Sequence, residues 1–116
     1  MHLETEISEL SPTAAIFIIR GRFSLGGQMS VTQGQITGLL DKGMKKLLVD
    51  LSDAEYIDSA ALGLLVHTNG ALLSRGGELR VAAPNDRVRG LFKMTHTDSM
   101  LKVYPDRQSA LEGFDA

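Results

Sequence analysis

Ser59 is the residue of this sequence whose setting points most directly to a chemical role. The apolar run at residues 47–51 is typical of a buried strand, and the hydrophobic pattern becomes helical from Ser59 onward. A loop that leads from a strand into a helix delivers this hydroxyl to the start of the helix. No base, metal ligand or glycine-rich loop adjoins it in the sequence. We therefore interpret Ser59 as a group that another protein modifies, rather than as an attacking nucleophile.

Asp58 and Ser59 have an ordinary structural role to set against modification. Either side chain can cap the helix by accepting a hydrogen bond from a free backbone N–H, which stabilises a helix by about 1 kcal/mol. A phosphate on Ser59 is equally compatible with the position, because the helix dipole and the free amides favour an anion. Phosphorylation would leave the fold intact and place a charge of about −2 on the surface beside Asp58.

The helix that starts at Ser59 has more apolar residues than one buried face requires. Its core face can be formed by five of them: Leu62, Leu65, Val66, Leu72 and Leu73. Ala60, Ala61 and Leu64 then remain near the N-terminus of the helix. They predict a small apolar patch around Ser59, which is either a surface for a partner or is covered by a neighbouring loop.

The sequence lacks the motifs of the common enzyme and cofactor sites. Gly21, Gly26 and Gly27 do not form a phosphate-binding fingerprint, and the lysine of a P-loop is missing. The three histidines, at positions 2, 67 and 96, lack the partner spacing of a metal site. We expect no enzymatic activity and no cofactor.

An acidic strand end is predicted just before Ser59, from Asp50, Asp53, Glu55 and Asp58. Carboxylates in such a place can bind Mg²⁺. Their more common role is to polarise a loop and to cap the helix that follows, so we expect no metal here.

The composition limits the class of protein. With 116 residues the chain has the size of one compact domain, and 43% hydrophobic and 22% charged residues are ordinary for a globular protein. A net charge of −2 argues against a nucleic-acid partner, which would require a basic face. No apolar run approaches the roughly 20 residues that span a bilayer, and no signal peptide is visible. We expect a cytoplasmic protein that does not insert into a membrane; its oligomeric state is not predicted.

Strand and helix patterns alternate along the chain in the order β-β-α-β-α-β-α-β-α, which predicts an α/β fold with a mixed, mostly parallel sheet of about five strands and about four helices. Strands are expected at residues 3–8, 14–19, 46–51, 78–82 and 101–104, the first two forming an antiparallel hairpin. Helices are expected at residues 28–42 and 59–75, after Asn85 as N-cap, and after Pro105 and Asp106. Residues 21–27 are expected to form a loop. In the first helix four residues should point inward: Val31, Ile36, Leu39 and Leu40.

The stretch Ile57-Asp58-Ser59-Ala60-Ala61-Leu62-Gly63 resembles the signature of the STAS domain, a family best known from bacterial anti-sigma factor antagonists. Residues 76–81 look like the family's turn into its fourth strand, and residues 88–95 resemble its third helix. Residues 101–104 and 110–111 resemble its last strand and last helix. The resemblance covers nearly the whole chain and implies one STAS domain over residues 1–116.

The resemblance implies a phosphorylation switch at Ser59. In that family an anti-sigma factor, itself a serine kinase, phosphorylates the signature serine; the unmodified domain binds this kinase and frees the sigma factor, and a phosphatase resets the domain. Carried onto this chain, the docking surface for the kinase would consist of Ser24, Asp58, Ala60, Ala61 and Leu64.

The sequence departs from the family pattern at four places. Ser24 stands where family members commonly have an aspartate after the second strand, and the following Leu25-Gly26-Gly27 is also unusual. Ala61 replaces the glycine of the signature, and Thr95-His96-Thr97 replaces the usual T-G-L. Two further hypotheses stay open beside the switch. One is an unmodified accessory subunit of a transporter or larger signalling assembly, and the other is weak nucleotide hydrolysis by the domain itself.

Overall fold

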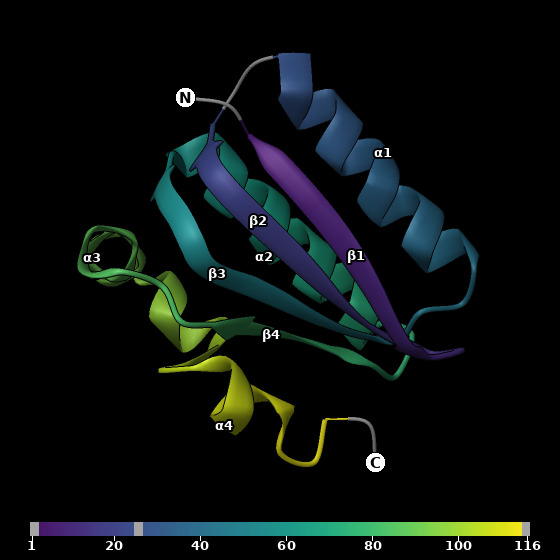
Figure 1. Ribbon diagram of the computed structural model, residues 1–116. Helices are drawn as coiled ribbons and strands as arrows, with labels where there is room; N and C mark the ends of the chain where they lie inside the picture. The colour runs from purple at the N-terminus through teal and green to yellow at the C-terminus, as the bar shows by residue number, and fades with distance from the viewer. Residues whose placement is uncertain (1–2, 25–26, 115–116) are drawn as a thin grey trace.

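The computed structural model describes residues 3–24 and 27–114. In these ranges the strands are β1 (Glu4–Ser11), β2 (Ala14–Phe23), β3 (Lys46–Ile57), β4 (Glu78–Ala82) and β5 (Lys102–Tyr104). The helices are α1 (Gly27–Asp41), α2 (Ser59–Leu73), α3 (Asp86–Met94) and α4 (Arg107–Leu111), with a 3₁₀ turn at Thr97–Ser99 (Figure 1). The predicted α/β class and element order are confirmed. His2 and the Leu25-Gly26 part of the predicted loop lie outside the described residues.

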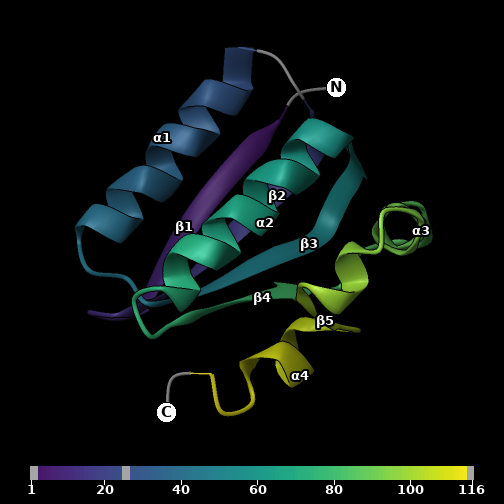
Figure 2. The ribbon, with the colours of Figure 1, turned by 180° about the vertical axis from the view of Figure 1, so that it is seen from behind.

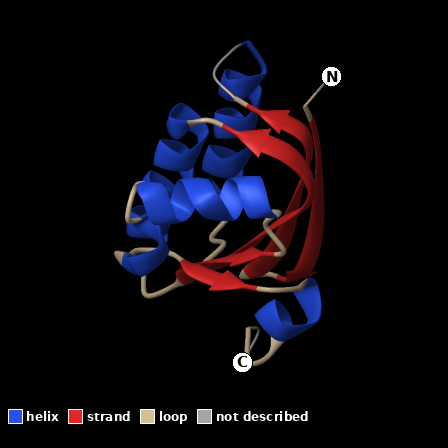
Figure 3. Ribbon diagram, turned by 90° about the vertical axis from the view of Figure 1, so that its left-hand side faces the viewer, coloured by secondary structure: helices blue, strands red, loops and turns tan. Residues whose placement is uncertain are grey.

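The sheet has the strand order β1-β2-β3-β4-β5. β1 pairs with β2 as the predicted antiparallel hairpin, and the other neighbours are parallel. Three helices cover one face, while α4 packs on the other (Figure 3). Figure 2 shows α2 between α1 and α3 on the covered face. No helix in the described part of the chain is long and apolar enough to cross a membrane.

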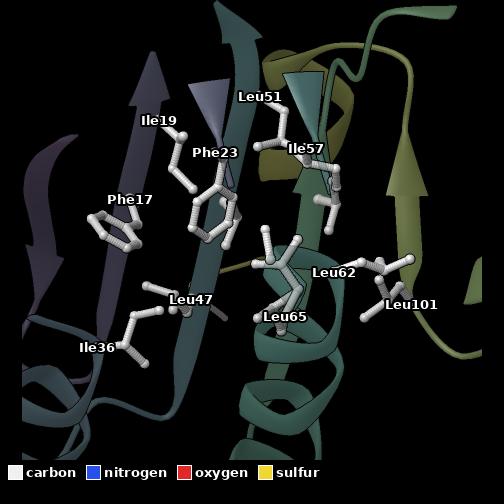
Figure 4. Packing of buried hydrophobic residues seen from close by; sticks show 14 of the residues in the cluster. Phe17, Ile19, Phe23, Ile36, Leu47, Leu51, Ile57, Leu62, Leu65 and Leu101 are labelled. Atoms are coloured by element: carbon white, nitrogen blue, oxygen red, sulfur yellow. The ribbon is translucent and has the colours of Figure 1, made fainter. Parts of the chain in front are cut away.

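β2 is buried on both faces, as its continuous apolar sequence predicts. Phe17 and Ile19 point toward the helices and pack with Leu47, Leu65 and their neighbours in the main core (Figure 4). Ile16 and Ile18 face the other way, into the smaller cluster that includes Ala110 and Phe114 of the C-terminal segment. The C-terminal segment thereby covers the face of the sheet opposite α1, α2 and α3.

β2 and β3 are both longer than the sequence predicts, so the start of the predicted loop at residues 21–27 and the predicted end of the third strand are wrong. β3 continues past Leu51, and β2 runs through Gly21 to Phe23, where the sequence predicts a loop. The extension forms because the ends pair, Arg22 with Tyr56 and Phe23 with Ile57. The acidic residues near Ser59 are consequently spread along a strand instead of gathering at its end. Among the residues that the structure describes, no group of His, Asp or Glu is placed to hold a metal ion.

The inward faces of two helices were predicted incorrectly in part. In α1, Ile36 and Leu39 are buried and Leu40 half-buried, but Val31 is 62% exposed. Met29 and Thr32 occupy the buried face instead, because positions 29, 32, 36 and 39 share the helical spacing that faces the sheet. In α2, Leu73 is exposed, because its position in the helical repeat turns it away from the sheet.

Candidate functional site

Ser59 is the first residue of α2, and its side chain is exposed. Asp58 before it has an extended backbone and is the N-cap, with Oδ1 accepting a hydrogen bond of 2.8 Å from the backbone N–H of Ala61. Of the two capping candidates in the sequence, the structure thus selects Asp58. The Ser59 hydroxyl is not needed to cap the helix, and it lies at the surface on the first turn.

Ser24 lies at the same end of the sheet as the signature. It directly follows Phe23, whose carbonyl oxygen accepts a hydrogen bond of 3.2 Å from the backbone N–H of Asp58. This bond continues the β2–β3 pairing by one residue and places the half-buried Ser24 beside the start of α2. The structure therefore brings together two segments that are 34 positions apart, the loop after β2 and the turn at Asp58.

The three predicted contact residues of α2 differ in exposure. Ala60 is exposed, and Leu64 is half-buried and packs against the main core. Ala61 is fully buried, so its inclusion in a docking surface is corrected: it shares the inward face of α2 with Leu65. The reason is again helical spacing, since residues four apart lie on one face. Ala61 supports the first turn from beneath and cannot touch a partner directly.

A groove with a volume of about 500 Å³ lies beside Ser59, between the start of α2 and α3. One wall contains Tyr56, Asp58 and Ser59, and the other contains Arg87, Leu91 and Met94 of α3. We call it the α2–α3 groove. Met94 is 79% exposed, so the α3 wall presents an apolar side chain to solvent beside Arg87. Ser59 stands at the edge of a hollow that has both charged and apolar walls.

A second groove, of about 360 Å³, lies on the other side of α2 and faces α1. Met29, Gln33, Ala60, Leu64 and His67 line it. We call it the α1–α2 groove. Ser59 and Ala60 are consecutive residues that line different grooves, so the first turn of α2 is a ridge between two hollows.

The α3 wall was missed in the sequence, although its position has a clear cause. Asn85 caps α3 by accepting a hydrogen bond of 2.8 Å from the Val88 N–H, as predicted. Its side-chain amide also donates to the carbonyl oxygens of Ala54 and Glu55 in β3, at 3.2 Å each. These bonds fix the start of α3 against the strand that leads to Ser59. Val88 is buried under α3, and the preceding residue, Arg87, lines the groove.

Comparison with known proteins identifies the family. The model of the STAS domain family matches residues 11–110. The chain belongs to the STAS domain family. A Thermotoga neapolitana protein, provisionally named a homologue of an anti-sigma factor antagonist, is 40% identical over 73 residues, which are 63% of this chain and 65% of the relative. The anti-sigma-B factor antagonist of Staphylococcus aureus is 30% identical over 84 residues, covering 68% of this chain and 78% of that protein.

Solved structures share the fold of this STAS domain. The crystal structure of a Thermotoga maritima protein, also provisionally named an anti-sigma factor antagonist, covers 97% of this chain and 95% of its own. Its TM-score is 0.87 at 24% sequence identity. The fold is therefore retained although most side chains differ.

Charges of both signs surround the signature serine of this STAS domain. Asp58 and Asp86 line the α2–α3 groove together with Arg87. Outside the groove wall, the guanidinium of Arg22 lies over the ring of Tyr56, 4.7 Å from its centroid, in a cation–π contact. The surface around Ser59 is mixed rather than acidic.

Proposed function

We propose that this STAS domain is an anti-sigma factor antagonist in the cytoplasm, and that phosphorylation of Ser59 switches its binding to an anti-sigma factor kinase. One observation carries the proposal: an exposed hydroxyl begins α2 on a ridge between two grooves, while Asp58 performs the capping. The serine is accessible to a kinase, and its modification removes no interaction that holds the helix. The family relation supports the choice of partner.

Modification of Ser59 replaces its O–H bond by an O–P bond. The bond between the γ-phosphorus of ATP and the oxygen that bridges it to the β-phosphate breaks, and ADP leaves. The proton of the hydroxyl passes to a base of the kinase. The phosphate adds about two negative charges beside Asp58, at a helix N-terminus that tolerates an anion. The fold should persist, and the charge should oppose a partner that binds the unmodified ridge. A phosphatase would restore the hydroxyl.

The proposed docking surface consists of residues around the ridge, of which Ser59 and Ala60 are exposed and the others half-buried: Ser24, Asp58, Ser59, Ala60 and Leu64. Ala60 offers a small apolar contact, and Leu64 contributes the part of its side chain that faces the α1–α2 groove. A partner segment that lies across the ridge would enter the grooves on both sides. This surface lies at the end of the sheet where parallel strands finish, a common place for sites in α/β folds.

Incubation with ATP and candidate kinases tests the proposal. The purified chain and its Ser59→Ala variant are each mixed with ATP and the kinases, and phosphate is located by peptide mass spectrometry. Phosphate on Ser59 of the wild type alone supports the switch. A stable complex that forms without ATP, with Ser59 unmodified, would instead favour an accessory subunit of a transporter or signalling assembly. Ser24 in place of the family's carboxylate is the observation that keeps that second function in view.

A further inference from the structure

Arg87 and Ser59 line the same groove from opposite walls. Arg87 is exposed on the first turn of α3, and it takes part in none of the ion pairs found among the described residues. A guanidinium presents five N–H donors in a planar fork that matches the oxygens of a phosphate. The groove thus contains a cation that is not engaged in an ion pair there and faces the proposed site of phosphorylation.

The other charges of the groove would repel a phosphate on Ser59, so a nearby cation would be favourable there. Asp58 and Asp86 both line the groove, and Oδ1 of Asp58 accepts a hydrogen bond from the backbone N–H of Ala61. A phosphate on Ser59 would add about two negative charges to these two carboxylates. The guanidinium of Arg22 stacks on the ring of Tyr56 and does not line the groove. Arg87 is the positively charged residue that lines the groove with Ser59.

We propose that Arg87 is the counter-charge of phosphorylated Ser59, so that modification ties the first turn of α3 to the first turn of α2 across the groove. The guanidinium donates two hydrogen bonds to phosphate oxygens and offsets the repulsion by Asp58 and Asp86. The phosphate and the arginine side chain then occupy the mouth of the groove, in front of Leu91 and Met94. Phosphorylation would act in two ways, by adding charge to the ridge and by closing the apolar wall of α3 to a partner.

This inference rests on the proposed modification of Ser59, but its test does not need the kinase. Phosphoserine is introduced at position 59 during translation, and the full chain is titrated by ³¹P NMR between pH 4 and 9. The second pKa of a free phosphoserine is about 6. We expect a value lower by about half a unit in the otherwise unchanged chain, because a nearby cation favours the dianion and an exposed pair is partly screened.

Arg87→Gln and Arg89→Gln form a matched pair of variants. Both arginines are exposed on α3, but Arg89 does not line the groove. Arg87→Gln should return the phosphate pKa toward its free value, Arg89→Gln should leave it unchanged, and Arg87→Lys should retain part of the lowering. Equal titration in the unchanged chain and in Arg87→Gln would overturn the proposal. So would an equal effect of Arg89→Gln, because that would reflect the net charge of α3.

The result is separable from the fate of the proposed function. If no kinase modifies Ser59, the incubation experiment fails, while the NMR titration still reports whether Arg87 binds a phosphate placed there. If the kinase acts but Arg87→Gln does not alter the titration, the switch stands and this inference falls. Melting temperatures of the variants, which substitute exposed residues, should stay close to that of the parent chain.

Discussion

The carboxylate of Asp50 in β3 accepts two hydrogen bonds from the guanidinium of Arg107 in α4, at 2.8 and 2.5 Å. Its other oxygen accepts a bond of 2.9 Å from the Ser52 N–H. Asp50 is 1% exposed and belongs to the face of the sheet that α4 covers. The pair fastens the C-terminal helix to the central strand, on the side of the sheet away from Ser59.

Acid should weaken this attachment. Burial raises the pKa of Asp50, but the hydrogen bonds from Ser52 and Arg107 outweigh it and hold the pKa below the ordinary 3.8. The unfolded chain therefore binds the proton first as pH falls, so the pair stabilises the fold above about pH 4, and this contribution disappears as pH drops through the folded pKa. We expect Asp50→Asn to lose about 1–3 kcal/mol of unfolding free energy at pH 7.

Urea denaturation of wild type and Asp50→Asn at pH 7 and pH 3 measures the effect. The difference between the two proteins should shrink at pH 3. The Asp53→Asn variant, whose carboxylate is exposed, is a control that should change little at pH 7. If the difference in unfolding free energy between wild type and Asp50→Asn were the same at both pH values, the proposed link between Asp50 protonation and stability would be contradicted.

Gly77 should be intolerant of any side chain. A Cβ built at this residue would lie 1.7 Å from the carbonyl oxygen of Lys45. That carbonyl accepts a hydrogen bond of 2.9 Å from the Glu78 N–H, so the contact is between two backbones that cannot easily separate. We expect Gly77→Ala to lose about 2–4 kcal/mol, in the range of strong overpacking.

The matched control for Gly77→Ala is Gly70→Ala. Gly70 is exposed in α2, with open space around its Cβ position. Alanine is the better helix former by about 1 kcal/mol, so this variant should be more stable than wild type. Opposite changes in the urea midpoint confirm the packing argument; equal losses would refute it.

The helix caps and helix starts were predicted best from the sequence, because they depend on interactions between neighbouring residues. Asn85 was expected to cap α3 and does so, because an asparagine cap requires only the next few backbone amides. The start of α2 was likewise expected at Ser59. The outward direction of Val31 was missed, since the phase of α1 depends on which side the sheet lies. The sequence pattern of α1 contains three glycines and no clean apolar stripe to reveal that side.

The grooves beside Ser59 could not be predicted, because they depend on long-range pairing. The extension of β3 to Ile57 requires the end of β2 to continue beside it, and neither strand end reveals the other in its own sequence. Arg87 belongs to a helix whose exposed charges look like an ordinary solvated face. Its place opposite Ser59 follows only when Asn85 ties α3 to β3.

His96 marks a position where glycine should be better. Its φ of 61° lies in the left-handed region, which costs a residue with a side chain roughly 1–2 kcal/mol. The side chain is exposed and makes no cap bond that would offset the cost. His96→Gly should raise the unfolding free energy by about 0.5 kcal/mol, since the flexibility of glycine in the unfolded chain cancels part of the gain.

Asparagine, which tolerates the left-handed region, is the companion substitution for His96. His96→Asn should also be stabilising, without the entropic cost of glycine. Thermal melts of both variants and of the wild type under the same buffer conditions measure the effect. A drop in melting temperature for both would mean that the His96 side chain makes an interaction that offsets the backbone strain.

Substitutions at Ala60 and Leu64 distinguish a loss of partner affinity from a loss of unfolding free energy. Ala60 is exposed, so Ala60→Glu should change the unfolding free energy by no more than about 0.5 kcal/mol. Leu64 is half-buried against the core, and Leu64→Glu should lose about 1–3 kcal/mol as well as affinity. Titration with the kinase identified for Ser59 should show weaker binding for both. Full affinity of Ala60→Glu would exclude the ridge from the docking surface.

Ser24→Asp tests whether the serine at position 24, where the resemblance to the family leads us to expect an aspartate, is an adaptation. Ser24 follows Phe23, whose carbonyl binds the Asp58 N–H, so a carboxylate there would join Asp58 and Asp86 around the Ser59 hydroxyl. A third negative group would oppose the arrival of a phosphate with a charge of about −2. We expect the rate of Ser59 phosphorylation to stay the same or to fall. Thr37→Asp, on the exposed side of α1, is the control for added charge and should leave the rate unchanged.

A faster reaction of Ser24→Asp would reverse this interpretation. A tenfold gain corresponds to about 1.4 kcal/mol of transition-state stabilisation. It would mean that the kinase still requires the family's carboxylate and that the native chain, with Ser24, is a poor substrate. The accessory-subunit function would then be the better account of the domain. An unchanged or slower rate instead indicates a kinase whose own surface fits the less acidic loop, with Arg22 and Arg87 supplying the positive charge around Ser59.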